Sequence, residues 1–152
     1  MSTRSEIAVQ KTDGSIASIY CHGDGYLEHN GVILNKHYAS YDKALSIIEQ
    51  NDCSSLGETI EESRFYNTWS GEDTESKKFD NEHHFMKKFG NNIFAEYIYL
   101  FKIAERTADD DWYVSELKFI DNPSDNYNHS LAYHTKFFLL SDALKKINER
   151  AA

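Results

Sequence analysis

Three residues near the N-terminus carry side chains that could act together in a reaction: Cys21, His22 and Asp24. They stand in the stretch 18–28, SIYCHGDGYLE, where an apolar run breaks into a glycine turn. A cysteine becomes a nucleophile when a nearby base lowers the pKa of its thiol. Successive residues of a strand point to opposite faces, so Cys21 and His22 are not expected to meet. The simpler prediction is that Cys21 is a core residue, His22 ends the strand and Asp24 caps the next helix. The turn is kept as an alternative site.

Metal, cofactor and nucleotide sites have little support in the sequence. His29 and His37 are eight residues apart, where an i, i+4 pair would suit a metal ion, and the two cysteines form no CxxC pair. The turn Gly23-Asp24-Gly25 lacks the longer phosphate-binding motifs and any basic residue, and Asp24 would repel a phosphate. We therefore predict no metal and no cofactor for the chain, and no nucleotide at this turn.

Carboxylates are concentrated in two segments. Residues 58–75 hold six of them against Arg64, and residues 105–125 hold seven against Arg106 and Lys118. Most acidic loops are only solvated. Alternatively, such a surface complements a basic groove on another protein, with Tyr66 and Trp69 as aromatic anchors, while Trp112 and Tyr127 are either further anchors or core residues. The predicted interaction surface consists of Glu58, Glu61, Glu62, Trp69, Glu72, Asp73, Asp109, Asp110 and Asp111.

Composition limits the classes of protein. The 152 residues suit one domain, and a content of 40% hydrophobic and 14% aromatic residues can fill a core. A net charge of −9 argues against direct binding of nucleic acid or of an anionic membrane. No apolar run reaches the ~20 residues of a membrane span, and the start resembles no signal peptide. A cytoplasmic location with free thiols at Cys21 and Cys53 is expected.

Local patterns predict most of the elements. Thr12-Asp13-Gly14 between apolar runs predicts an N-terminal hairpin. Apolar spacing predicts a helix over 26–38 and a second helix, capped by Ser40, through residue 50. The expected elements after it are a loop over 51–57, a short strand near 64–66, a helix over 81–89 ended by Gly90, strands over 93–103 and 112–120, and a helix over 142–150 capped by Ser141. Together they predict a single α+β domain over 1–152, with an antiparallel β-sheet and helices packed on one face.

Four stretches carry a family resemblance: SIASIYCHGDGYLEHNGVILNKHY, CSSLGETI, AEYIYLF and DWYVSEL. They resemble an uncharacterised family of small phage and prophage proteins with a strand–CHxDGY–helix N-terminal motif. The similarity covers residues 5–60 well and 93–118 less closely. It implies expression inside a bacterium and implies no reaction. Gly23 departs from the family, which carries tryptophan or another large residue between the histidine and the aspartate.

These features predict a non-enzymatic phage or prophage protein that binds and modulates a host protein. The concrete form is a counter-defence or host-takeover inhibitor that partly mimics nucleic-acid charge, with a nucleic-acid-binding host protein as its partner. Two alternatives stay open. One is a small enzyme or ligand-binding protein that uses the turn of Cys21, His22 and Asp24 with a distant histidine. The other is a phage structural or assembly protein.

Overall fold

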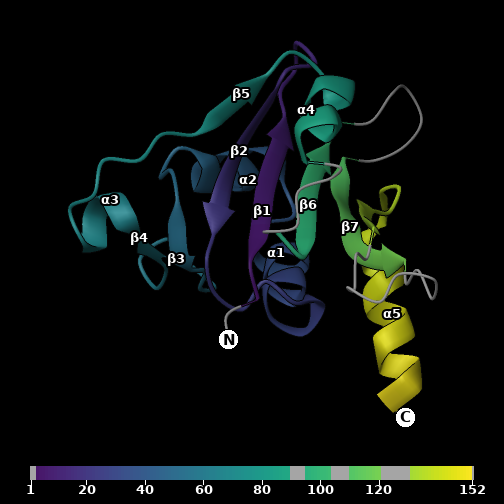
Figure 1. Cartoon of the computed structure of the whole chain (residues 1–152). Coiled ribbons are helices and arrows are strands. Elements are labelled where there is room, and N and C mark those ends of the chain that lie inside the picture. The colour runs from purple at the N-terminus through teal and green to yellow at the C-terminus, as the bar shows by residue number, and fades with distance from the viewer. Residues whose placement is uncertain (1–2, 90–94, 104–109, 121–130, 152) are drawn as a thin grey trace, which may run out of the picture.

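A tight hairpin begins the fold in the computed structural model, which describes residues 3–89, 95–103, 110–120 and 131–151 (Figure 1). β1 (Ser5–Gln10) and β2 (Ile16–Cys21) pair antiparallel from Ser5↔Cys21 to Gln10↔Ile16. Gly14 has a φ of 88° at the turn, a conformation that glycine adopts without steric cost. Asp13 accepts hydrogen bonds from the backbone N–H and the hydroxyl of Ser15. The predicted Asp-Gly hairpin is confirmed.

The hairpin lies inside a mixed sheet with the order β4-β3-β2-β1-β6-β7-β8. β1 pairs parallel with β6, and β2 pairs parallel with β3, so the expectation of a purely antiparallel sheet is wrong. The long chain between β1 and β6 allows this arrangement, because parallel neighbours need a long crossover connection. The strands after the hairpin are β3 (Cys53–Ser55), β4 (Arg64–Phe65), β5 (Lys77–Phe79), β6 (Tyr97–Lys102), β7 (Asp111–Ile120), β8 (Leu131–His134) and β9 (Phe138–Leu139).

The larger core lies between one face of the sheet and most of the helices. Ile7, Ile19, Tyr99 and Phe101 point into it and are fully buried. The chain covers this face with η1 (Leu27–Gly31, a π-helix), α1 (Val32–His37), α2 (Tyr41–Ile48) and α5 (Leu140–Ala151). Ser40 caps α2, because its hydroxyl accepts a hydrogen bond of 3.3 Å from the N–H of Lys43. The helices predicted over 26–38 and after Ser40 are confirmed.

A second core lies on the opposite face of the sheet. Ala8, Ile98 and Leu100 point there, against Phe85 and Phe89 of α4 (Glu82–Phe89). Helices therefore cover both faces, and the expectation of helices on one face only is wrong. Successive residues of β1 and β6 are apolar, so these strands present apolar side chains on both faces of the sheet. Both faces must therefore be covered to remove these side chains from water.

The α+β class is confirmed, and some boundaries differ from those predicted. Residues Cys53–Ser55 form a strand inside the predicted loop, and the predicted short strand appears as β4. α5 begins at Leu140, so Ser141 lies in its first turn and is not its cap. β6 and β7 form the predicted antiparallel pair, in register from Tyr97↔Glu116 to Lys102↔Asp111. The predicted helix end at Gly90 and the first residues of the strand predicted over 93–103 lie outside the described residues.

Candidate interaction surface and the glycine turn

Residues 57–75, here termed the acidic lobe, form a projection that includes β4 and α3 (Tyr66–Trp69) at one end of the sheet (Figure 1). Hydrogen bonds between side chains and backbone groups hold the acidic lobe together. The Ser63 hydroxyl accepts from the N–H of Gly57 at 2.8 Å. Asn67 Oδ1 accepts from the N–H of Thr74 at 2.9 Å, and Asn67 Nδ2 donates to its carbonyl at 3.0 Å. Phe65 is 2% exposed and anchors the lobe in the larger core, so the lobe is a built structure.

The acidic lobe presents its carboxylates to water. All six are exposed, namely Glu58, Glu61, Glu62, Glu72, Asp73 and Glu75. Among the ion pairs of the described residues, only Glu58 of this set takes part, with His37 Nε2 at 3.7 Å. Trp69 is 56% exposed, and the guanidinium carbon of Arg64 lies 5.3 Å from the centroid of its ring. The lobe thus brings together the predicted Trp69 and all the predicted carboxylates of segment 58–75.

Asp110 and Asp111, two of the carboxylates predicted at residues 109–111, do not join the acidic lobe. Asp111 begins β7, and β2, β1 and β6 separate β7 from β3 and β4 in the sheet. Its Oδ1 accepts a hydrogen bond of 2.8 Å from the N–H of Trp112. Asp110 is exposed, and Asp109 lies outside the described residues. The sequence therefore predicted one surface where the structure has two separate regions.

The predicted aromatic anchors differ in exposure. Trp112 is fully buried in the larger core, and its Nε1 donates to the carbonyl oxygen of Tyr38 at 2.8 Å. Trp112 is thus a core residue, as one of the two interpretations expected. Tyr66 is partly buried, and Tyr127 lies outside the described residues. Among the aromatic residues of the acidic lobe, Trp69 is the exposed one.

In the alternative site, Cys21 and His22 make separate contacts: Cys21 ends β2 and packs in the larger core, whereas His22 follows the strand and lies beside Tyr20. Cys21 is fully buried, its Sγ donates to the carbonyl of Gly23 at 3.6 Å, and Asn30 Nδ2 donates to that sulfur at 3.5 Å. His22 Nδ1 instead lies 2.8 Å from the hydroxyl oxygen of Tyr20. The His22 imidazole therefore does not act as a base toward the Cys21 sulfur.

Cys53 is the residue that meets Cys21. The two cysteines are register partners on β2 and β3, and both are buried free thiols. The hydrogen bond with Cys21, together with burial, raises the pKa of the Cys53 thiol. The same hydrogen bond lowers the pKa of the Cys21 thiol, but Cys21 is fully buried and therefore out of reach of a substrate, which favours a packing role for this pair. Local patterns did not predict this pairing, because the contact joins segments about thirty residues apart.

The glycine turn is built on Gly25, and Asp24 does not cap the helix that follows. The N-cap of η1 is Tyr26, with no side-chain hydrogen bond, and Asp24 is exposed with a φ of 55°. A Cβ on Gly25 would lie 2.8 Å from both the Ser5 Cβ and the carbonyl oxygen of Thr3. The capping prediction for Asp24 is wrong, and Gly25 packs tightly against the start of β1.

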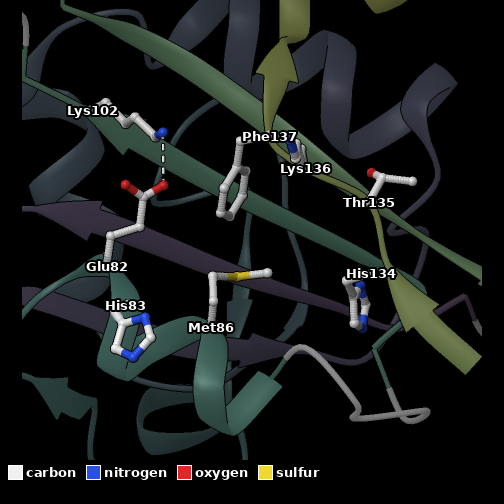
Figure 2. Close-up of a pocket in the computed structure, with 8 residues that line it drawn as sticks. All are labelled: Glu82, His83, Met86, Lys102, His134, Thr135, Lys136 and Phe137. Carbon is white, nitrogen blue, oxygen red and sulfur yellow. Dashed lines mark ion pairs between the residues drawn. The ribbon is translucent and has the colours of Figure 1, made fainter.

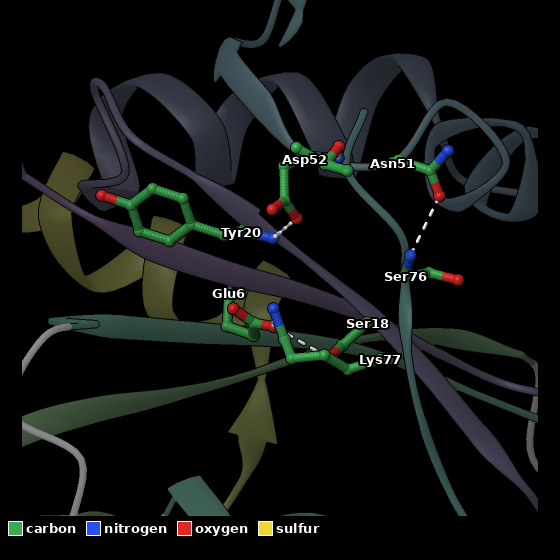
Figure 3. Close-up of polar contacts among 8 residues, drawn as sticks. Glu6, Ser18, Tyr20, Asn51, Asp52, Ser76 and Lys77 are labelled. Carbon is green, nitrogen blue, oxygen red and sulfur yellow. Dashed lines mark hydrogen bonds and ion pairs between the residues drawn. The ribbon is translucent and has the colours of Figure 1, made fainter. Parts of the chain in front are cut away.

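A buried carboxylate that the sequence did not reveal lies on β1 (Figure 3). Glu6 is 2% exposed. Its carboxylate accepts a hydrogen bond of 2.8 Å from the Ser18 hydroxyl and forms an ion pair of 3.0 Å with Lys77 Nζ. Burial raises the pKa of Glu6 to about 7, although both partners oppose the rise. Nearby, Asp52 Oδ1 accepts from the N–H of Tyr20 at 2.9 Å. These contacts fasten β5 and the segment before β3 to the hairpin.

The described residues contain neither a metal-binding cluster nor a membrane-spanning helix. In the part of the chain that the structure describes, no three histidine, cysteine or acidic residues cluster in a way that could hold a metal ion. Within the same residues no helix has the length and apolarity to span a membrane. Comparison with protein-family models, curated proteins and solved structures finds no significant match.

Proposed function

We propose that the protein is a binding protein, not an enzyme, and that its acidic lobe docks on a basic groove of a partner protein that otherwise holds nucleic acid. One observation carries the proposal. Six exposed carboxylates and a 56%-exposed tryptophan share a single lobe of nineteen residues that contains one basic residue, Arg64. Trp69 supplies apolar area of the kind found at interface hot spots, and the carboxylates supply charge.

The two parts of the lobe have different roles in binding. Exposed charges gain little on contact because water already solvates them, so they act mainly by accelerating association. A tryptophan that leaves water gains from its large apolar surface, so it acts mainly by slowing dissociation. Together they imply a complex whose association rate depends on salt and whose lifetime depends on Trp69.

The family resemblance supplies the proposed setting. A phage or prophage protein acts inside a bacterium, so the proposed partner is a host protein whose groove binds DNA or RNA. Occupation of that groove by the acidic lobe would exclude the nucleic acid. The protein would then serve as a counter-defence or host-takeover inhibitor through partial mimicry of nucleic-acid charge.

The first test is affinity capture from a nuclease-treated bacterial lysate, read out by mass spectrometry. Two variants with four charges removed are compared with the parent. The lobe variant carries Glu61→Gln, Glu62→Gln, Glu72→Gln and Asp73→Asn, and the control variant carries Glu28→Gln, Glu49→Gln, Glu96→Gln and Glu149→Gln, all at exposed positions. We expect the parent and the control to retain a nucleic-acid-binding protein that the lobe variant loses. Equal capture by all three would contradict the proposal.

The second test measures binding kinetics with the captured partner. We expect the lobe variant to slow association, and expect the difference to shrink as salt shortens the Debye length from ~10 Å at 0.1 M to ~3 Å at 1 M. Trp69→Ala should mainly speed dissociation, and added oligonucleotide should compete with the parent. A partner that binds oligonucleotide and this protein simultaneously would exclude the mimicry.

A further inference from the structure

The region around α4 carries the opposite charge to the acidic lobe. Residues 77–88, KKFDNEHHFMKK, contain four lysines and two histidines against Asp80 and Glu82. In a chain of net charge −9, this segment is a local basic region. A cavity of about 530 Å³ opens beside it, between α4, the end of β6 and the segment that joins β8 to β9 (Figure 2). Its volume falls within the range of small-molecule sites, which is roughly 300–1,000 Å³.

One lysine ammonium group of the cavity lining, that of Lys102, is held in a fixed position by its neighbours. Lys102 Nζ forms an ion pair of 2.7 Å with Glu82 Oε1, and its side chain is 27% exposed. The same nitrogen lies 4.9 Å from the ring centroid of Tyr113 and 5.1 Å from that of Phe137. Two aromatic faces and a carboxylate therefore restrict an ammonium group that is usually mobile at a surface.

The other lining groups give the cavity a basic rim and an apolar wall. Lys136 and His83 are exposed and line the cavity together with Lys102 (Figure 2). Met86 and Phe137 are half-buried and both pack against the second core. The lining has two lysines, Lys102 and Lys136, against a single carboxylate, Glu82, so its net charge is positive. Such a lining attracts a small anion that also carries an apolar or aromatic body.

We propose that this cavity binds an aromatic phosphate of the size of a nucleoside monophosphate. The phosphate would lie against Lys102, Lys136 and His83, and the ring would lie on Phe137 and Met86. The site is independent of the acidic lobe, which belongs to the far end of the sheet order at β4. Because Glu82 and a bound phosphate would compete for Lys102, Glu82 would weaken binding and thereby restrict the site to ligands with a doubly charged group.

Isothermal titration calorimetry of the full chain with adenosine monophosphate tests the site, with adenosine and inorganic phosphate as separate probes. We expect Lys102→Met to weaken binding of the monophosphate about tenfold, as for a hydrogen bond to a charged group, and Lys136→Met to weaken it about threefold. Glu82→Gln should tighten binding, a gain that a purely structural role would not produce. Lys43→Met on α2, an exposed lysine far along the chain, is the matched control and should leave binding unchanged.

Several outcomes would overturn the proposal. The absence of binding at millimolar monophosphate would do so, as would binding that Lys102→Met and Lys136→Met leave intact. Equal affinity for inorganic phosphate and for the monophosphate would remove the aromatic part of the site. Should Lys102→Met destabilise the fold by leaving Glu82 unpaired, the double variant Glu82→Gln with Lys102→Met restores the charge balance. We expect this double variant to bind the monophosphate more weakly than Glu82→Gln alone, and equal affinity would also overturn the proposal.

Discussion

Asp24 holds a backbone conformation that few residues other than glycine adopt, with a φ of 55°. We predict that Asp24→Ala lowers the free energy of unfolding by about 1 kcal/mol, because a Cβ without a polar group is strained in this region. Asp24→Gly should leave stability unchanged or raise it by up to about 1 kcal/mol, since relief of strain offsets the added freedom of the unfolded chain. Urea denaturation of both variants measures the effect.

Gly14 offers a matched control for Asp24. Its φ is 88°, and a Cβ there would meet nothing within 4 Å, so Gly14→Ala reports the backbone cost alone. A loss for Gly14→Ala similar to that of Asp24→Ala would support strain at both turns. If Asp24→Gly were as unstable as Asp24→Ala, the Asp24 side chain would have a stabilising contact, and strain would not explain the position.

Glu6 makes stability depend on pH in a direction opposite to that of most acidic residues. Its pKa rises from an ordinary value of 4.5 to about 7 on folding, so the native state holds a proton that the unfolded chain releases between these values. The contribution of Glu6 to stability is therefore full below pH 4.5 and is lost as the pH rises through 7. The total change is on the order of 3 kcal/mol.

The variant Glu6→Gln isolates this dependence, because glutamine does not titrate and the other ionisable groups are shared. We expect its stability relative to the parent to increase as the pH rises from 4.5 to 8, measured by urea denaturation at each pH. Lys77 and Asp52 both act on Glu6. The ion pair with Lys77 lowers the pKa of Glu6 and so limits the rise caused by burial, whereas Asp52 adds to that rise. A stability difference that does not change with pH would show that Glu6 titrates as an exposed residue does. Glu28→Gln at an exposed site is the control.

Among the elements, α2 illustrates how a short signal determines a boundary. Ser40 is exposed, and its hydroxyl accepts from the N–H of Lys43 at the first turn. We predict that Ser40→Ala lowers stability by about 1 kcal/mol, the usual cost of a lost N-cap, whereas Ser40→Asp retains it. Thermal unfolding followed by circular dichroism is the measurement. Equal loss in both variants would point to a role for Ser40 other than capping.

The elements that the sequence predicted correctly depend on neighbours in the chain. The Asp-Gly turn, the Ser40 cap and the alternation in β6 are local signals, so the hairpin, α2 and the β6–β7 pair could be recognised. β3 has three residues and no alternation, and a distant strand completes it through the Cys21↔Cys53 pair. The parallel pairing of β1 with β6, and the position of α4 on the second face, are also long-range choices that local patterns do not contain.

The same division holds for the candidate sites. The carboxylates of residues 58–75 lie within one short segment, so their grouping with Trp69 followed from the sequence alone. The separation of Asp111 from that group depends on strand order, which is a tertiary property. The burial of Glu6 beside Lys77 and the position of Lys102 beside Glu82 join residues far apart in the chain. Neither pair could be found without the fold.

At the scale of the whole molecule, charge is distributed unevenly. The acidic lobe at β4 has six exposed carboxylates against Arg64, whereas residues 77–88 carry an excess of lysine. Like charges that share a small lobe repel one another and lower its stability. Such an arrangement costs folding free energy, and it is consistent with selection of the carboxylates for binding.

Removal of carboxylates from the lobe should recover this folding free energy. The lobe variant and the control variant defined above each remove four carboxylates from different places, so both reduce the net charge of −9 by the same amount. We expect the lobe variant to melt about 2 °C higher than the control variant at low salt, because it alone relieves local crowding. The difference should shrink at 1 M salt, where the Debye length falls to about 3 Å. Differential scanning calorimetry at two salt concentrations provides the comparison. A lobe variant that melts below the control would mean that these carboxylates stabilise the lobe, and their density would then need no explanation in binding.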